Sequence, residues 1–318
     1  MPEQAPARSS LLFSRDALLR LIIPLVIEQL LLMTVGMADT VMVTTSGEAA
    51  VSGVSLVDNI NTLIIQVFSA LSTGGAVVVS QYLGRQDTDN AKAASKQLLY
   101  AMCALSLLLM GAALVLRQHI LALIFGRVEA DVMENALVYF LLTATAYPFM
   151  GIYNAGAALF RAMGNSKVSM FCSLVVNVIN ITVNAVLIFG FGMGAAGAGI
   201  GTLVSRIAAA VIIMALLNHP DHVLRVEGLL RFEFRGAIVK RILFIGIPNG
   251  KLMVLKLITT FGTSAVAANA IANSVAGVIN VPGMALGLAI ITVIGQCMGA
   301  GETGQAVYLS LIHISEPT

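Results

Sequence analysis

Two acidic residues stand inside the first long apolar stretch of the chain. Glu28 and Asp39 are eleven positions apart, which places them within about 20° of one face of a helix at about 100° per residue. The same spacing separates them by about 16 Å along the axis, so the two carboxyl groups cannot share a proton directly. One face with two acids at different depths suits a helix that lines a water-filled cavity, because a lipid-facing carboxylate is rarely tolerated.

Each acid also has a structural interpretation. Asp39 is expected to take up a proton or bind a cation, as buried carboxyl groups at functional sites do, or else to cap the end of its helix. Glu28 is expected either to present a negative charge to cationic compounds or to bond neighbouring side chains. Both alternatives stay open for Glu28.

A second polar pattern consists of three amides. Asn177, Asn180 and Asn184 follow the spacing i, i+3, i+7, which puts them on one helix face. An amide oxygen can coordinate Na⁺, but an amide releases no proton. The stripe therefore indicates either an ion site or hydrogen bonds that hold neighbouring helices together.

Other polar residues have plainer interpretations. Asp58 and Asn59, followed by Asn61, are expected to cap the start of the second membrane helix, with the lining of a cavity as the alternative. Gly197 and Gly201 have the spacing of a close helix contact. Met33 belongs to a set of 15 methionines that either line an adaptable substrate cavity or fill the core. The histidines have no metal-binding spacing, so we expect no cofactor.

Composition places these residues in a membrane. Of the 318 residues 58% are hydrophobic and 11% are charged, with a mean hydropathy of +0.92. A soluble domain carries about 25% charged residues, so a soluble enzyme is nearly excluded. The net charge of +2 is too small to indicate a nucleic-acid-binding protein. An intramembrane enzyme is also disfavoured, because no HExxH, GxSxG or paired-aspartate signature accompanies the two acids.

The apolar runs predict an all-α, polytopic fold. A membrane helix needs about 20 mostly apolar residues, and eight stretches qualify: 18–42, 57–80, 98–116, 136–159, 170–189, 195–217, 238–260 and 270–294. Basic residues such as Arg85, Lys92 and Arg225 gather in alternate loops, whereas the opposite side receives Arg117 and Arg127. This bias predicts a cytoplasmic N-terminus.

Part of the sequence repeats itself. Ser80-Gln81-Tyr82-Leu83-Gly84 matches Gly295-Gln296-Cys297-Met298-Gly299 at an offset of 215 residues, and Thr44-Thr45 matches Thr259-Thr260 at the same offset. Six spans lie between the copies, so both have the same orientation, as in a parallel repeat of six-helix halves. The second copy is shorter by nine residues near Asn249–Lys251, and its first span carries Lys251 and Lys256.

The last ten residues, 309–318, match one reading frame of a transposon-end sequencing adapter and are expected to be an artefact. The expected organisation is a cytoplasmic N-terminal segment (1–17), a complete six-helix lobe (18–217), a cytoplasmic linker (218–241) and an incomplete second lobe of about two helices (242–308).

Several motifs together resemble the MATE (multidrug and toxic compound extrusion) transporters. They are Gly36-Met37-Ala38-Asp39-Thr40, Ser80-Gln81-Tyr82-Leu83-Gly84, Phe160-Arg161-Ala162-Met163-Gly164-Asn165, and Asn177 to Asn184 followed by Gly190-Phe191-Gly192. The resemblance covers about 18–308. It implies two six-helix lobes around a central cavity, of which the first is complete here.

The resemblance also implies site residues. Asp39 occupies the position of the coupling acid, and Asn180 and Asn184 belong to the same ion site, with Na⁺ at Asp39 and Asn180 or a proton on Asp39. Some branches have an aspartate where this chain has Asn184, so Asp39 is expected to be the lone titratable member. Glu28, Asn177 and Met33 are assigned to the substrate cavity.

The expected activity is cation-coupled (Na⁺ or H⁺) antiport of small organic compounds, cationic ones included. We expect a monomer in a bacterial inner membrane, in contact with lipid and not with nucleic acid. One alternative is a flippase for lipid-linked sugars, which a cavity lined by Lys and Arg would favour. Another is a non-functional fragment, because polar groups left without partners in hydrocarbon cost several kcal/mol each.

Overall fold

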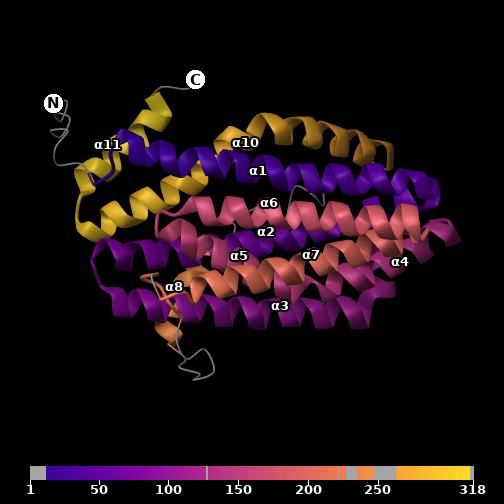
Figure 1. The fold of residues 1–318 in the computed structure, drawn as a ribbon, viewed down its shortest axis with the longest axis horizontal. Coiled ribbons are helices and arrows are strands. Elements are labelled where there is room, and N and C mark those ends of the chain that lie inside the picture. The colour runs from indigo at the N-terminus through magenta and orange to yellow at the C-terminus, as the bar shows by residue number, and fades with distance from the viewer. Residues whose placement is uncertain (1–11, 127, 221, 227–234, 247–262, 316–318) are drawn as a thin grey trace.

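The computed structural model describes residues 12–126, 128–220, 222–226, 235–246 and 263–315 (Figure 1). Over these residues the chain is helical and contains no β-strand, as the apolar runs predicted. In chain order the helices are α1 (Arg15–Val43), α2 (Glu48–Gly84), α3 (Thr88–Phe125), α4 (Ala130–Thr145), α5 (Tyr147–Ala162), α6 (Ser166–Ala185), α7 (Gly194–Leu217), α8 (Gly236–Gly246), α10 (Thr263–Ala300) and α11 (Thr303–Ser315). A short 3₁₀ turn (Thr44–Ser46) follows α1, and a π-helical segment (Val186–Gly190) extends α6.

Within the described part of the chain, six helices are long and apolar enough to cross a membrane: α1, α2, α3, α6, α7 and the segment Asn280–Ala300 of α10. The expected span 136–159 is formed by α4 and α5, which meet at a bend of 46°. Pro148 lies in the first turn of α5. It has no N–H to donate and its ring clashes with the preceding turn, which explains a break at this point.

The second helix begins earlier than the apolar run indicated. Gly47, with φ of +95°, precedes α2, and the helix then runs from Glu48 to Gly84. Asp58 therefore lies more than two turns inside α2, and the prediction that Asp58 and Asn59 cap it is wrong. The apolar run marks the part of a helix that lies in hydrocarbon, whereas the hydrogen-bonded helix continues beyond it.

The region after α7 is described in part. Helix α8 starts at Gly236, inside the range expected for the linker, 218–241, and α11 extends to Ser315. Residues 247–262 lie outside the described part of the chain. The predicted nine-residue gap near Asn249–Lys251, the charges of Lys251 and Lys256, and most of the expected span 238–260 fall there.

Helix α2 is at the centre of the packing and contacts α3, α4, α5, α8 and α10. Helix α1 lies against α6 on one side and α10 on the other (Figure 1). A large apolar core contains side chains from every helix between α2 and α7. Phe68, Tyr147 and Phe160 are among its fully buried members. A second apolar cluster joins α1 to α10 and α11 through Leu21, Leu25 and others.

Candidate functional site

The predicted ion-coupling residues form one buried cluster between α1 and α6. Asp39, near the C-terminal end of α1, is 6% exposed. Its Oδ1 accepts a hydrogen bond of 2.5 Å from Nδ2 of Asn184, and the same amide donates weakly to Oδ1 of Asn180 at 3.4 Å. The structure thus brings Asp39, Asn180 and Asn184 together, although α1 and α6 are far apart in the sequence.

Small residues let α7 approach this cluster. A Cβ atom on Gly201 would collide with the side-chain oxygen of Asn184, and one on Gly197 would press against Leu187 and Ile188. The close helix contact predicted from the spacing of these two glycines is therefore confirmed. Any larger residue at position 201 would displace the amide that bonds Asp39.

A second carboxyl group belongs to the same region. Oδ1 of Asp58 accepts hydrogen bonds from the hydroxyl of Tyr139 at 3.0 Å and from Nδ2 of Asn61 at 3.4 Å. The hydroxyl of Tyr147 in turn donates to Oδ1 of Asn61 at 3.0 Å. The charges of Asp39 and Asp58 act on each other, and Tyr139 interacts with both.

Asp58 thus acts electrostatically on Asp39, and the expectation that Asp39 is the lone titratable member of an ion site stays a prediction. The signal for Asp58 was the same as for Asp39, an acid within an apolar helix. It was misread because the start of α2 was placed at the start of the apolar run.

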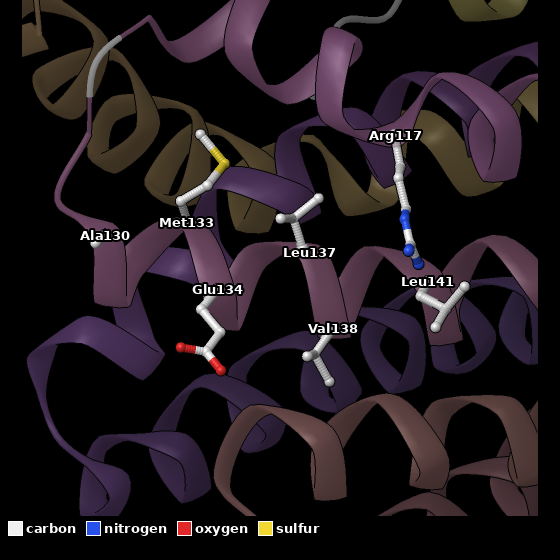
Figure 2. A pocket seen from close by; sticks show the side chains of 7 residues that line it. All are labelled: Arg117, Ala130, Met133, Glu134, Leu137, Val138 and Leu141. Atoms are coloured by element: carbon white, nitrogen blue, oxygen red, sulfur yellow. The ribbon is translucent and has the colours of Figure 1, made fainter.

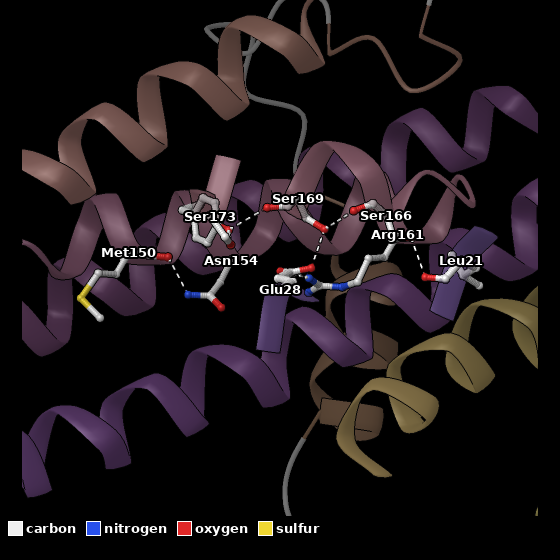
Figure 3. Close-up of polar contacts among 9 residues, drawn as sticks. Leu21, Glu28, Met150, Asn154, Arg161, Ser166, Ser169 and Ser173 are labelled. Atoms are coloured by element: carbon white, nitrogen blue, oxygen red, sulfur yellow. Dashed lines mark hydrogen bonds and ion pairs between the residues drawn. The ribbon is translucent and has the colours of Figure 1, made fainter. Parts of the chain in front are cut away.

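Both carboxylate oxygens of Glu28, the other acid of α1, are bonded to other side chains. Glu28 is 2% exposed, and its Oε1 forms an ion pair of 3.1 Å with Nη1 of Arg161 at the end of α5. Oε2 accepts a hydrogen bond of 2.6 Å from the hydroxyl of Ser169 on α6 (Figure 3). This geometry supports the structural interpretation of Glu28. Sequence reasoning missed Arg161 because the two residues are far apart along the chain.

The remaining members of the predicted substrate cavity lie along the same helices. Asn177 donates hydrogen bonds to the carbonyl oxygens of Leu31 at 3.1 Å and Ser173 at 3.0 Å, so it joins α6 to α1. Met33 is half-buried on α1. Their assignment to a substrate cavity stays a prediction.

One surface hollow lies apart from these residues. Its volume is about 390 Å³, and it is lined by residues of α3 and α4 (Figure 2): Arg117, Ala130, Met133, Glu134, Leu137, Val138 and Leu141. Its walls are mostly apolar. None of the predicted site residues contributes to it.

Comparison with known proteins shows what the chain is similar to. The protein-family model described as MatE matches residues 24–186 and 245–312. The chain is 27% identical over 271 residues to "Probable multidrug resistance protein YoeA" of Bacillus subtilis (strain 168), which covers 80% of this chain and 58% of that protein. It is 26% identical over 302 residues to "Probable multidrug resistance protein NorM" of Thermotoga maritima, covering 91% and 64%.

Solved structures share the fold. One described as "Outward-facing conformation of a multidrug resistance MATE family transporter of the MOP superfamily" superposes with a TM-score of 0.86 at 20% identity, covering 94% of this chain and 68% of that one. "Crystal structure of MATE in the bent conformation" superposes with a TM-score of 0.85 at 20% identity, covering 95% and 69%. The chain thus spans about 58–65% of the length of the first curated relatives.

Proposed function

The chain belongs to the MatE family of multidrug efflux transporters and is a multi-pass membrane protein, and we propose that its site serves cation-coupled antiport of small organic compounds. In this proposal Na⁺ or a proton enters at Asp39 as the organic compound leaves. Ion binding favours one arrangement of the lobes and substrate binding favours the other, which produces alternating access. The proposed location is a bacterial inner membrane, with a monomeric protein and a cytoplasmic N-terminus.

The observation that carries the proposal is the bond between Asp39 and Asn184. A carboxyl group inside a membrane protein is kept for a function by default. The nitrogen of the Asn184 side chain is occupied by Asp39, whereas its oxygen is buried without a hydrogen-bond partner. A carboxylate beside a free amide oxygen is the kind of oxygen-rich set that binds a hard cation such as Na⁺.

The presence of a second carboxyl group, that of Asp58, raises the question of which acid binds the ion. Asp58 already accepts bonds from Tyr139 and Asn61, so Asp39 is the acid proposed to bind the ion directly. The sites proposed for the substrate are Asn177 and Met33, on α6 and α1. Glu28 contributes less to them, because its charge is balanced by Arg161.

The test is the substitution Asp39→Asn in the gene as it stands in its genome, expressed in a host without its own efflux pumps. We expect loss of drug export, measured as accumulation of a fluorescent drug, with unchanged membrane insertion. The matched control is Asp131→Asn, which changes an exposed acid in the first turn of α4. Export in the Asp39→Asn strain at the level of the parent would contradict the proposal.

A binding measurement on the purified 318-residue chain separates the two ions. Calorimetric titration with NaCl, against choline chloride at equal ionic strength, detects Na⁺ binding. A pH indicator in weakly buffered solution detects proton uptake. Either signal should disappear in the Asp39→Asn variant and persist in the Asp131→Asn variant.

A further inference from the structure

Arg206 is a charged residue in the middle of a membrane span. It lies twelve positions after Gly194, the first residue of the 24-residue helix α7, which is long and apolar enough to cross a membrane. A charge at this depth is costly unless it has a counter-ion or water. In the described part of the chain the buried ion pair is that of Glu28 with Arg161, and Arg206 forms no such pair. Its Nε is buried without a hydrogen-bond partner.

Further unpartnered atoms accompany it. Five buried side-chain polar atoms lack a hydrogen bond within the described residues, and four of them lie on α6 and α7: Asn177 Oδ1, Asn184 Oδ1, Thr202 Oγ1 and Arg206 Nε. Buried polar groups normally have partners, and clusters without them need an explanation such as a ligand. The four atoms are spread over about two turns of α6 and one turn of α7, and each is a polar atom that a bound compound would partner.

These atoms lie at related depths. The contact between Gly201 and Asn184 sets the register of α7 against α6. The two helices are consecutive and run in opposite directions, so Arg206, five positions beyond Gly201, reaches the level of Asn180, four positions before Asn184. Thr202 precedes Arg206 by one turn and shares its face.

Polar groups near Arg206 have hydrogen-bond partners of their own. Asp39 interacts electrostatically with Arg206, but its Oδ1 is bonded by Asn184. Tyr139 on α4 donates to Asp58, and Tyr153 on α5 bonds the hydroxyl of Ser173 at 2.8 Å. The Nε–H of Arg206 is thus a buried donor without a hydrogen-bond partner in the described part of the chain.

We propose that Arg206 binds an oxyanion of the transported compound, so that the substrates include organic anions and zwitterions carrying a carboxylate. A guanidinium group binds a carboxylate through two parallel hydrogen bonds. The free oxygen of Asn177 then accepts a hydrogen bond from a hydroxyl or amide group of the same compound. This inference rests on the proposed function, since it names the substrate class of that transport site.

The experiment uses the 318-residue chain in nanodiscs of phosphatidylcholine and two matched probes, dansylglycine and its neutral amide, dansylglycinamide. The two differ by the carboxylate alone. We expect the parent chain to bind the acid at least tenfold more tightly than the amide, measured by dansyl fluorescence polarisation. Equal affinity for the acid and the amide overturns the proposal without any variant.

Variants assign the preference to one residue. Arg206→Gln should lose at least tenfold in affinity for the acid and leave the amide unchanged, whereas Arg206→Lys should retain part of the preference. Arg117→Gln, on α3 beside the surface hollow, is the control and should behave as the parent. A preference that persists in Arg206→Gln overturns the proposal.

The outcomes also separate this inference from the proposed function. Ion binding that depends on Asp39 tests the antiport site, and the preference for the acid tests Arg206. Loss of the preference with intact ion binding in Arg206→Gln shows that the variant is folded. Ion binding with no preference for the acid contradicts the role of Arg206 and leaves the antiport site standing.

Discussion

Gly84 and Gly299 meet opposite backbones at the crossing of α2 and α10. A Cβ atom on Gly84 would collide with the carbonyl of Gln296, and a Cβ atom on Gly299 would collide with the carbonyl of Gln81. The contact is reciprocal, and the 215-residue offset aligns each glycine with the other. The two copies of the repeated motif therefore pack against each other through the positions that the repeat makes equivalent.

This crossing predicts the effect of a single methyl group. Gly84→Ala and Gly299→Ala should each destabilise the protein by about 1–3 kcal/mol, the usual cost of forcing extra atoms into a packed contact. Backbone carbonyls cannot turn away as a side chain can. Thermal unfolding of the purified protein in detergent measures the change. Gly111→Ala is the control, because nothing lies within 4 Å of the added atom; equal melting temperatures for Gly84→Ala and the control would contradict the prediction.

The ion pair between Glu28 and Arg161 predicts strong coupling. Removing one partner of a buried pair leaves an uncompensated charge and costs about 3–5 kcal/mol. Glu28→Gln and Arg161→Gln should therefore each be strongly destabilising, and the double variant should cost much less than the two together. A double-mutant cycle measures this. Glu134→Gln, an exposed acid on α4, should change little; additive effects of the two main substitutions would refute the coupling.

Tyr139 is expected to stabilise α2 against α4 through Asp58. Tyr139→Phe keeps the ring in the core and removes the donor of the 3.0 Å bond. Oδ1 of Asp58 then keeps only the longer bond from Asn61, at 3.4 Å, so we expect a cost of about 1 kcal/mol. Unfolding experiments should show this loss, with Tyr308→Phe, at an exposed position, as the matched control. An unchanged stability in Tyr139→Phe would contradict the prediction.

Asp87 predicts a dependence on pH outside the membrane. It precedes α3, and hydrogen bonds from the side chain and the backbone N–H of Asn90 hold the pKa of Asp87 below its usual value of 3.8. A lowered pKa in the folded state means that the stabilisation is present above about pH 4 and is lost as the pH falls through the lowered value. Asp87→Ala should therefore lower the melting temperature at pH 7, and the difference from the parent should shrink near pH 3. Asp87→Asn keeps a capping oxygen and should show a smaller difference at pH 7; a difference for Asp87→Ala that does not change with pH would contradict this account.

The sequence by itself was sufficient for the class of fold and the positions of most spans. Apolar length is a local property, and a run such as 195–217 predicts a membrane helix whatever surrounds it. The break between α4 and α5 was harder to predict, because a proline allows a helix to bend but does not determine the angle of the bend. The start of α2 was misplaced for a related reason, since hydropathy reports contact with lipid and not the end of a helix.

The candidate site divides in the same way. The positions of Asp39 and the asparagine stripe were evident from spacing, since residues on one helix share a face by geometry alone. Three other features depended on which helices are neighbours. They are the bond from Asn184 to Asp39, the pairing of Glu28 with Arg161, and the electrostatic effect of Asp58 on Asp39. Contacts between residues more than a hundred positions apart come from the packing of whole helices, and only the tertiary structure decided them. The same holds for Nε of Arg206, which has no hydrogen-bond partner within the described part of the chain, because a side chain's partners depend on how the helices pack.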